Sequence, residues 1–170
     1  MRHARVETSF GTLLCAATDT GVCLVSLDAE RGDRQLAEWV ARHAPDAEVV
    51  EDAEFLAPTA EQLQAYDRGE RRVFDLPLDP RGTPFERAVW DGLCEIPFGN
   101  TTTYGELAAR LGRPGAAQAV GGAAGRNPVA VVIPCHRLLA RDGLGGFSGG
   151  LRVKRRLLGL EGVPVQAEFS

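Results

Sequence analysis

The chain has 170 residues, which is enough for one ordinary domain or two small ones, and it can bury a core without support from disulfides or metals. With 44% hydrophobic and 25% charged residues it has the composition of a globular protein, which excludes a disordered or fibrous chain. A formal net charge of −4 argues at first against nucleic acid as the partner.

The charge is unevenly distributed along the chain. Residues 1–80 carry 16 acidic and 8 basic side chains, whereas residues 81–170 carry 7 acidic and 11 basic ones. Such an asymmetry indicates two regions with different tasks. We therefore predict two domains, 1–80 and 81–170, joined near residues 79–82, where Pro and Gly are typical of a linker.

The sequence has no apolar run as long as a membrane span and no secretory signal at its start, so we expect a cytoplasmic protein. Its cysteines have neither the spacing of a disulfide framework nor that of a CxxC metal site, and in a reducing compartment they would remain thiols. We accordingly predict no bound metal and no cofactor. The cysteines are Cys15, Cys23, Cys94 and Cys135.

The first half is predicted to contain strands followed by helices. Two apolar segments, 12–18 and 22–27, are typical of strands, and Asp19-Thr20-Gly21 between them is typical of a hairpin turn. Three further elements are predicted: a helix capped by Asp33 with Leu36, Trp39 and Val40 on one face, a helix after Thr59 with Gln62 in its capping box, and a strand over 73–78.

Capping patterns mark the helices of the second half. Thr83-Pro84-Phe85-Glu86 predicts one helix start, and Thr103-Tyr104-Gly105-Glu106 predicts another, with an end at Gly112. A helix over 116–125 follows closely, so these two helices form a plausible helix-turn-helix. The remaining elements are a buried strand over 129–133, ended by Pro134, and a helix over 151–160 with Leu157 and Leu158 inside and Arg152, Lys154, Arg155 and Arg156 mostly outside.

The tetrapeptide Pro134-Cys135-His136-Arg137 is the candidate reactive site. A thiol at the end of a buried strand, followed by His and Arg, is placed where its pKa could be lowered, and the thiolate is the nucleophile. Adjacent side chains on an extended chain point in opposite directions, so a bridging water could carry the proton from Cys135 to His136, and a carboxylate could orient the imidazole. The alternative is a buried Cys that serves only as a small hydrophobic residue.

Two further segments are unusual in composition. Residues 115–125 are Gly and Ala except for Gln118 and Val120, which lets another group approach the helix backbone closely. Packing against a neighbouring helix and entry into a narrow minor groove both explain this composition. Phe147 and Ser148 lie in a Gly-rich loop that lacks a phosphate-binding GK[ST], so the aromatic ring could stack on a planar ligand or anchor the loop.

Together these segments resemble the methylated-DNA–protein-cysteine methyltransferases, or O6-alkylguanine-DNA alkyltransferases. The matching pieces are FERAVWDGLCEIPFGNTTTYGELAARLGRP, AVGGAAGRNPVAVVIPCHR and GGFSGGLRVKRRLLGLEG, and GRNP ahead of IPCHR is the most specific of them. The resemblance implies an α/β (α+β) fold: a ribonuclease-H-like strand and helix domain over 1–80, and a helical alkyltransferase domain with a helix-turn-helix over 81–170.

The resemblance also implies a suicide repair reaction. Cys135 would take a methyl or alkyl group from O6 of guanine, with O4-alkylthymine as a second candidate substrate, and would keep it after a single turnover. His136 would activate Cys135 through a water, with Glu161 orienting the imidazole. Asn127 would form the hinge before the active-site segment, and Tyr104 would help to swing the nucleotide out.

The implied partner is double-stranded DNA, bound through its minor groove without sequence preference, by a monomer that can cluster along DNA. A base inside a duplex must be flipped out to be reached, and Phe147 and Ser148 would line its pocket. The family usually has Arg in the recognition helix where this chain has Gln118, which predicts weaker flipping. DNA contacts are expected from Gln118, Ala119, Gly121, Gly122, Arg126 and Arg137.

Two other functions compete with this one. A lesion-binding protein without transfer resembles the same domain but replaces the nucleophilic Cys, whereas Cys135 is present here. A thiol hydrolase would need an oxyanion hole, for which the sequence has no motif.

Overall fold

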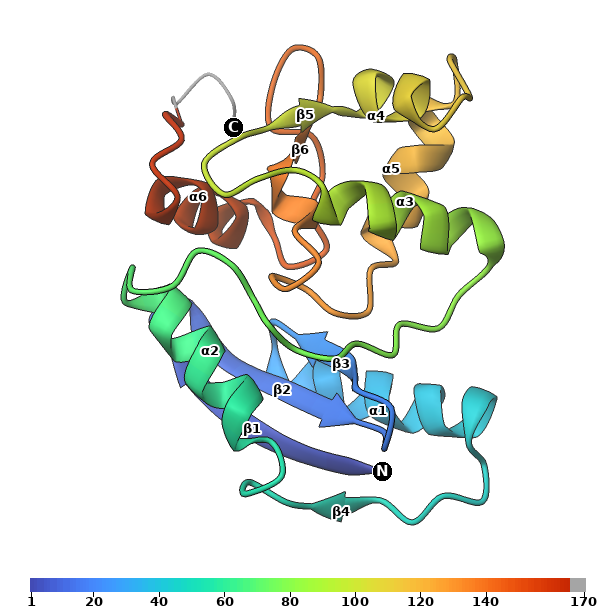
Figure 1. Cartoon of the computed structure of the whole chain (residues 1–170), viewed down its shortest axis with the longest axis vertical. Helices are drawn as coiled ribbons and strands as arrows, with labels where there is room; N and C mark the ends of the chain where they lie inside the picture. The colour runs from blue at the N-terminus through green and yellow to red at the C-terminus, as the bar shows by residue number, and fades with distance from the viewer. Residues whose placement is uncertain (166–170) are drawn as a thin grey trace. The chain divides into compact units, whose positions relative to one another are not determined.

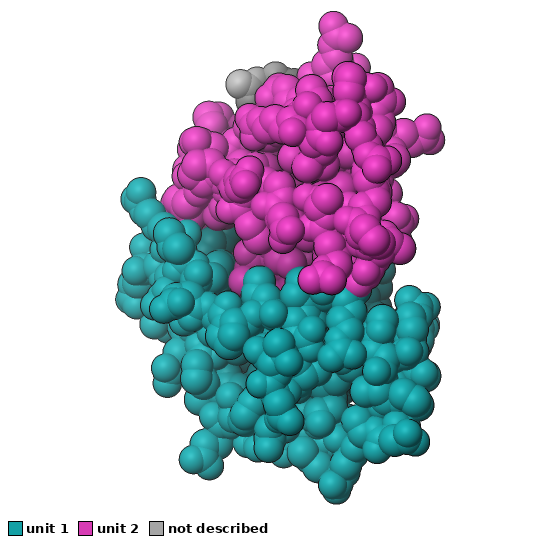
Figure 2. Space-filling model, turned by 45° about the vertical axis from the view of Figure 1, so that its right-hand side comes forward, with its two compact units in different colours: residues 1–81 teal, residues 82–170 magenta. Residues whose placement is uncertain are grey.

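The computed structural model describes residues 1–165 and divides the chain into two compact units, Met1–Arg81 and a second one that begins at Gly82 (Figures 1 and 2). The first unit combines a sheet with two helices, and the second is mainly helical. The predicted α/β fold class is therefore confirmed. None of the helices in residues 1–165 is both long and apolar enough to cross a membrane.

The sheet of the first unit has the order β3-β2-β1-β4. β1 (Arg2–Thr8) pairs antiparallel with β2 (Gly11–Ala17), β2 pairs antiparallel with β3 (Val22–Ser26), and β4 (Val50–Glu51) is a short parallel edge strand beside β1. The predicted strands over 12–18 and 22–27 are confirmed as β2 and β3. β1 was not predicted, although its alternation of buried Ala4 and Val6 with exposed Arg5 and Glu7 is the period of a half-buried strand.

Helix α1 (Ala29–His43) packs on this sheet and begins earlier than predicted. Its N-cap is Asp28, whose carboxylate accepts the backbone N–H of Glu30 and of Arg31 at 3.0 and 3.2 Å. Asp33, the predicted cap, lies inside the helix and pairs with Arg5 instead. The predicted apolar face is present, because the buried core cluster joins helix and sheet through Leu14, Ala16, Cys23, Leu24, Leu36 and Trp39.

Helix α2 (Ala57–Asp67) also begins before its predicted start. Pro58 lies in its first turn, so Thr59 is a buried residue inside the helix and caps nothing. Gln62 forms no capping box: its amide donates to the carbonyl of Asp75 and accepts the N–H of Asp75, both at 2.9 Å. The helix prediction holds, but the capping prediction was wrong because the Gln amide satisfies a distant backbone segment.

The predicted strand over 73–78 is absent. Within this segment Leu78 alone forms an isolated bridge, to Val22. Pro77 has no N–H to donate to a ladder, although its carbonyl accepts the N–H of Val22 at 2.9 Å. Gly21 allows this approach, since a Cβ there would lie 2.5 Å from the Pro77 carbonyl.

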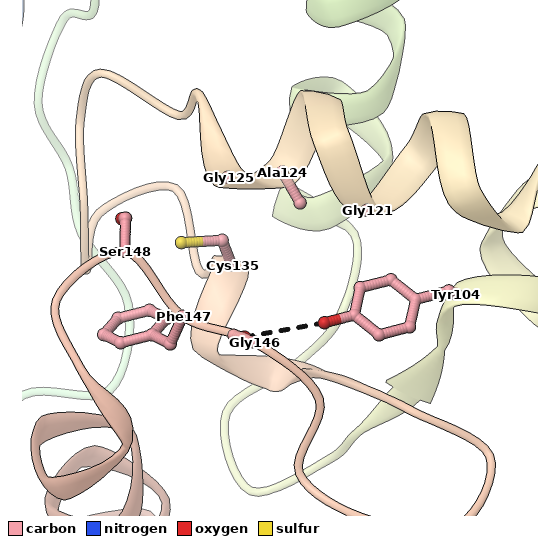
Figure 3. A pocket seen from close by; sticks show the side chains of 8 residues that line it. All are labelled: Tyr104, Gly121, Ala124, Gly125, Cys135, Gly146, Phe147 and Ser148. Carbon is pink, nitrogen blue, oxygen red and sulfur yellow. Dashed lines mark hydrogen bonds between the residues drawn. The ribbon is translucent and has the colours of Figure 1, made fainter.

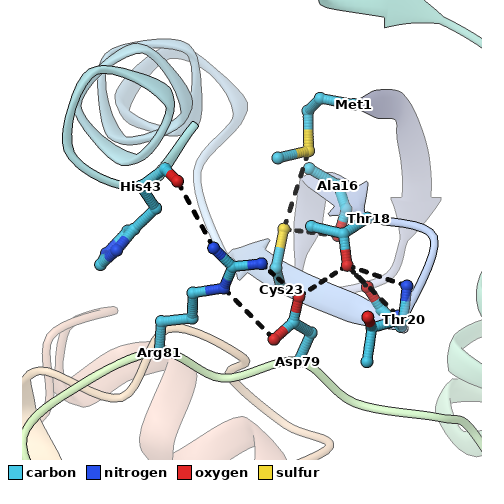
Figure 4. A network of polar contacts seen from close by, with 9 residues as sticks. Met1, Ala16, Thr18, Thr20, Cys23, His43, Asp79 and Arg81 are labelled. Carbon is cyan, nitrogen blue, oxygen red and sulfur yellow. Dashed lines mark hydrogen bonds and ion pairs between the residues drawn. The ribbon is translucent and has the colours of Figure 1, made fainter. Parts of the chain in front are cut away.

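The end of the first unit is held to the β2–β3 hairpin by polar contacts (Figure 4). Thr18 donates its hydroxyl to Asp79 at 2.6 Å, and Arg81 pairs with Asp79 at 3.1 Å and reaches the carbonyl of His43 at 3.5 Å. These side chains fix the segment in which Pro and Gly suggested a linker.

The second unit contains four α-helices and a two-stranded sheet in its described residues, 82–165. The helices are α3 (Pro84–Cys94), α4 (Tyr104–Arg110), α5 (Ala117–Gly125) and α6 (Leu151–Leu160). The strands β5 (Thr102–Thr103) and β6 (Leu138–Leu139) pair in parallel. The predicted capping box of Thr83 and Glu86 is present. At the start of α4 only half of the predicted capping box forms within residues 1–165: Thr103 accepts the N–H of Glu106 at 3.1 Å, without the reciprocal hydrogen bond to the Glu106 side chain.

Helices α4 and α5 pack on each other, joined by a short turn, in the manner of a helix-turn-helix. Gly112 and Gly115 lie in this turn with φ values of +73° and +91°, which residues with a Cβ rarely adopt. The prediction of two short helices with a tight Gly-containing turn is confirmed.

The predicted buried strand over 129–133 is a compact loop. Val131 has a φ of +72°, and the N–H of Ile133 donates back to the carbonyl of Val129 at 2.9 Å, so the segment turns on itself. The Asn127 side chain holds the loop by accepting the N–H of Val129 and donating to the carbonyl of Ile133. A buried apolar run alone does not distinguish such a loop from a strand.

Helix α6 buries Leu157 and Leu158 as predicted. It also buries Lys154 completely, whereas the pattern of the helix placed this lysine mostly outside. The hydrogen bonds of its ammonium, described below, explain the difference.

Candidate active site

Cys135 begins a single turn of 3-10 helix, η1 (Cys135–Arg137), that follows the loop over 129–133. Its thiol opens into a pocket of about 130 Å³ between α5 and the loop that carries Phe147 (Figure 3). The small residues of α5 form one wall of this pocket, and the 146–148 loop forms another. The residues that line it are Tyr104, Gly121, Ala124, Gly125, Cys135, Gly146, Phe147 and Ser148.

A buried network of His136, Arg137 and Glu161 lies directly after the thiol. The imidazole Nε2 of His136 lies 2.6 Å from Glu161, and the guanidinium of Arg137 donates to the same carboxylate at 2.7 and 3.1 Å. The backbone N–H of Gly99 also donates to it, at 3.2 Å. One carboxylate therefore fixes η1, the start of the turn after α6 and the loop after α3.

The hydrogen bonds of His136 decide which of its nitrogens is basic. A carboxylate only accepts hydrogen bonds, so Nε2 carries the proton and Nδ1 has a free lone pair. Nδ1 is buried and has no hydrogen-bond partner within residues 1–165. Burial lowers the pKa of His136, with Glu161 opposing that effect, so the imidazole is neutral at pH 7 and is able to take a proton.

Arg137 does not lie where a DNA contact would require it. Its side chain is 7% exposed, and besides Glu161 it donates to the carbonyl of Ile96 at 2.6 Å. The expectation that Arg137 contacts DNA is therefore corrected: the side chain holds Glu161 and the backbone after α3. The sequence could not distinguish the two roles, because an Arg that contacts DNA and an Arg that pairs with a buried carboxylate can both follow a candidate nucleophile directly.

The electrostatic environment of Cys135 also differs from the expectation. Burial raises the pKa of the Cys135 thiol, while a hydrogen bond from Asn127 and the charge of Lys154 lower it. The net direction is upward, not downward as the tetrapeptide suggested. In this state Cys135 is a protonated thiol, and its ionisation requires a base that removes the proton.

Asn127 and Tyr104 hold opposite sides of the site. Asn127 fixes the loop before Cys135 through the contacts described above and also reaches the thiol. The Tyr104 ring leans on Gly145, where a Cβ would meet its hydroxyl at 2.5 Å, and its hydroxyl donates to the carbonyl of Gly146 at 3.5 Å. Both residues thus join the cluster around Cys135, together with Phe147 and Ser148 of the pocket wall.

The other predicted DNA contacts lie on α5 and at its C-terminal end. Gln118, Ala119 and Gly122 are exposed, and Gly121 is half-buried against Tyr104. Arg126 is 61% exposed and pairs with Glu86 of the α3 capping box at 2.6 Å. The opposite face of α5 is buried, so the small residues of this helix lie both at the packed face and at the exposed face. The buried residues are Val120, Ala123 and Ala124.

Lys154, Ala124, Gly125 and Gly146 belong to the site but were not predicted. The first donates to backbone around the pocket, and the others line it. One signal for Lys154 was available: it is the single lysine beside 18 arginines.

The fold and the site together define a two-unit α/β protein in which a pocket thiol, backed by a buried His–Glu pair, lies beside a helix-turn-helix. Comparison with known proteins assigns the two units to two domains of one protein family. The family model described as 6-O-methylguanine DNA methyltransferase, ribonuclease-like domain, matches residues 1–80. The model described as the DNA binding domain of the same methyltransferase matches residues 84–163.

Individual relatives agree over nearly the whole chain. Methylated-DNA–protein-cysteine methyltransferases of Methanosarcina barkeri and Methanosarcina mazei are 42% and 48% identical, each over 95% of this chain and 97% of its own length. The crystal structure of Mycobacterium tuberculosis OGT in complex with DNA is 34% identical, with a TM-score of 0.81 over 99% of this chain and 97% of that one. The chain belongs to the 6-O-methylguanine DNA methyltransferase family, enzymes of direct-reversal DNA repair.

Proposed function

We propose that this protein repairs O6-alkylguanine in duplex DNA by transferring the alkyl group to Sγ of its own Cys135, once per molecule. The observation that carries the assignment is a thiol that opens into a pocket and is followed by a buried imidazole paired with a carboxylate. A protonated thiol with a raised pKa needs such a base, and His136 Nδ1 supplies its lone pair.

The chemistry balances without a cofactor. A water carries the thiol proton to His136 Nδ1, and Glu161 stabilises the imidazolium that forms. Sγ attacks the alkyl carbon, the carbon–O6 bond breaks, and its electron pair remains on the guanine. One proton then passes from the imidazolium of His136 through water to the guanine, so that both are neutral again. The products are an unmodified guanine and a thioether on Cys135. Since no step regenerates the thiol, each molecule acts once.

The pocket geometry supports a flipped base as the substrate. The alkyl carbon on O6 cannot be reached in a stacked duplex, so the nucleotide has to turn out toward Cys135. Phe147 offers an aromatic face, and Ser148 a hydroxyl, beside the thiol. Tyr104 would assist the turning of the nucleotide from the opposite wall, and Asn127 would keep Cys135 in place.

We propose that α5 enters the minor groove. Ala119, Gly121 and Gly122 bring little bulk to the groove, and Arg126 would contact phosphate, which gives affinity without sequence preference. The protein would act as a monomer that can cluster along DNA. Its cysteines within residues 1–165 are free thiols, which supports action in the reducing cytoplasm.

A mass-spectrometric transfer assay tests the assignment. Duplex DNA with labelled O6-methylguanine is mixed with the protein, and the expected product is one added methyl on Cys135. The Cys135→Ser variant should bind the same DNA and acquire no methyl group. Binding without an adduct would support a lesion-binding protein, several turnovers would support a hydrolase, and an adduct on another residue would overturn the assignment of Cys135.

The substitution Gln118→Arg tests the recognition helix. Gln118 is exposed and uncharged, so it lacks the reach and charge of the Arg that the family usually has there. We expect Arg to raise duplex affinity and single-turnover rate by about tenfold, the value of one charged hydrogen bond. Asn100→Arg, at an exposed and uncharged position of the second unit outside the proposed groove contact, controls for charge alone. Equal gains from both variants would mean that position 118 has no special role.

A further inference from the structure

Lys154 is the single lysine of a chain with 18 arginines, and it is completely buried. Its neighbour Arg152 on α6 is exposed. A buried lysine loses hydration and side-chain freedom, so its position requires compensating contacts.

The ammonium of Lys154 finds these contacts in three backbone carbonyls. Nζ donates to Leu138, Leu144 and Gly146 at 2.7, 2.5 and 3.0 Å. Leu138 directly follows η1, whereas Leu144 and Gly146 belong to the loop that leads into Phe147. The ammonium therefore ties the segment that carries the nucleophile to the wall of its pocket.

The geometry is specific for lysine. Three N–H bonds on one tetrahedral nitrogen can point to three separate carbonyls, whereas a planar guanidinium presents its donors as a fork. The Gly146 carbonyl also accepts the Tyr104 hydroxyl, so Lys154 and Tyr104 hold one pocket residue from two sides.

The charge of Lys154 is solvated differently from that of Arg137. Arg137 pairs with the Glu161 carboxylate, whereas the three acceptors described for Lys154 are neutral. Burial lowers the pKa of Lys154 to about 8, so at pH 7 most of the ammonium is charged. Its field acts on the titratable groups that face it from η1: it lowers the pKa of both Cys135 and His136. On the side of α4, the group that shares its Gly146 acceptor is Tyr104.

We infer that Lys154 is a positioning residue for the alkyl transfer: its ammonium fixes the pocket loop to the backbone beside Cys135, and its positive charge favours the Cys135 thiolate. This inference rests on the proposed function for the identity of the reaction. The effect on the thiol itself is independent of DNA, so the two can fail separately.

The first experiment measures the Cys135 thiol without DNA. Alkylation by iodoacetamide is followed against pH by mass spectrometry of the Cys135 peptide, in a Cys94→Ser background that removes the exposed thiol. In Lys154→Met we expect about tenfold slower alkylation at pH 7, where the Lys154 ammonium is charged, and a difference from the wild-type protein that shrinks above about pH 8, where the lysine loses its proton. Arg152→Met, which removes a charge from the exposed side of α6, should leave the alkylation rate at pH 7 unchanged.

The second experiment separates rate from binding. In single-turnover transfer from an O6-methylguanine duplex, Lys154→Met should lower the maximal rate by about tenfold or more and leave the half-saturating DNA concentration unchanged. Lys154→Arg keeps the charge but not the three contacts, so it should keep the rate of iodoacetamide alkylation at pH 7 and lose transfer rate. If Lys154→Met does not fold, the Lys154→Arg variant still tests whether the three contacts of Lys154 support transfer.

An unchanged alkylation rate at pH 7 in Lys154→Met would overturn the electrostatic role, and a Lys154→Arg variant with the full transfer rate would overturn the role of the contacts. A change in half-saturating DNA concentration alone would show that Lys154 serves DNA binding instead. The iodoacetamide experiment can give the expected result while the wild-type protein acquires no methyl group on Cys135 from DNA. That outcome would count against the proposed function and not against the effect of Lys154 on the thiol.

Discussion

The two units of this chain treat buried polar groups in opposite ways. In the first unit the buried polar residues within 1–81 are Ser26 and Thr59, both uncharged. In the described part of the second unit, the buried set includes four residues that can carry charge: His136, Arg137, Lys154 and Glu161. The first unit is a sheet with an apolar core, and the second has a polar network in its interior.

This difference shows where the chain buries charged groups despite their unfavourable desolvation free energy. Burying charges is unfavourable unless each is paired or hydrogen-bonded, and an apolar replacement of similar shape is often at least as stable. The second unit keeps its buried charges beside Cys135, where, in the proposed function, a base and a positive charge serve the thiol. The units should therefore respond differently when one buried side chain is removed. The two tryptophans, Trp39 in the first unit and Trp90 in the second, allow each to be followed separately.

The largest effect is expected from Glu161→Ala. It leaves the guanidinium of Arg137 and the imidazole of His136 buried without their common acceptor, so the second unit should lose about 3–5 kcal/mol of unfolding free energy. Urea unfolding followed by Trp90 fluorescence in a Trp39→Phe background measures this loss. The exposed Glu106 provides the control, since Glu106→Ala should change the same quantity by less than about 0.5 kcal/mol. Equal losses in the two variants would contradict the account of the buried network.

Leu14→Ala should destabilise the first unit by about 2–5 kcal/mol. Leu14 is fully buried and lies against α1 so closely that a Cβ on Gly32 would be 2.7 Å from its own Cβ. Trp39 fluorescence in a Trp90→Phe background follows this unit. The pH midpoint of Cys135 alkylation should stay unchanged below the unfolding transition, because no buried charge has been altered. A shifted midpoint would show that the apolar unit tunes the thiol.

The fold was predicted from the sequence wherever local chemistry decides the structure. Thr83 and Glu86 form the expected capping box, and the hairpin turn and the helix-turn-helix glycines lie where they were expected. The strand predicted over 129–133 was wrong because one side chain, Asn127, supplies the backbone with hydrogen bonds that a ladder would otherwise supply. No local pattern contains that information.

The site was predicted only in part, because some of its contacts come from segments that are distant in the sequence. The family resemblance grouped Cys135, His136 and Glu161, and the structure places the latter two within hydrogen-bond distance. Spacing did not distinguish the buried Arg137 and Lys154 from exposed cations, because burial of a cation depends on acceptors from distant segments. Ile96 and Glu161 hold the first, and Leu138 and Leu144 hold the second.

Acidification should lower the unfolding free energy of the second unit through His136. Burial lowers the pKa of His136 below its ordinary value of about 6.5. The unfolded chain therefore binds the proton more readily, and stability present above about pH 6.5 is lost as the pH falls toward the folded pKa, by up to about 1.4 kcal/mol per pH unit. Trp90 unfolding between about pH 6.5 and 5, above the range in which carboxyl groups titrate, measures this slope. His43→Asn should leave it unchanged, although burial and Arg81 also lower the pKa of His43.

The smallest effect is expected from the exposed pair of Arg5 and Asp33 in the first unit. The two side chains lie 2.9 Å apart, a shorter separation than some contacts of the buried network, yet they are 50% and 53% exposed. Water screens such a pair and solvates each partner when the other is removed, so Asp33→Asn should cost less than about 1 kcal/mol. Trp39-detected urea unfolding in low and high salt measures the cost, which salt should reduce further. A loss close to that of Glu161→Ala would mean that burial is not what makes the second unit's charges expensive to disturb, because distance alone would then explain both results.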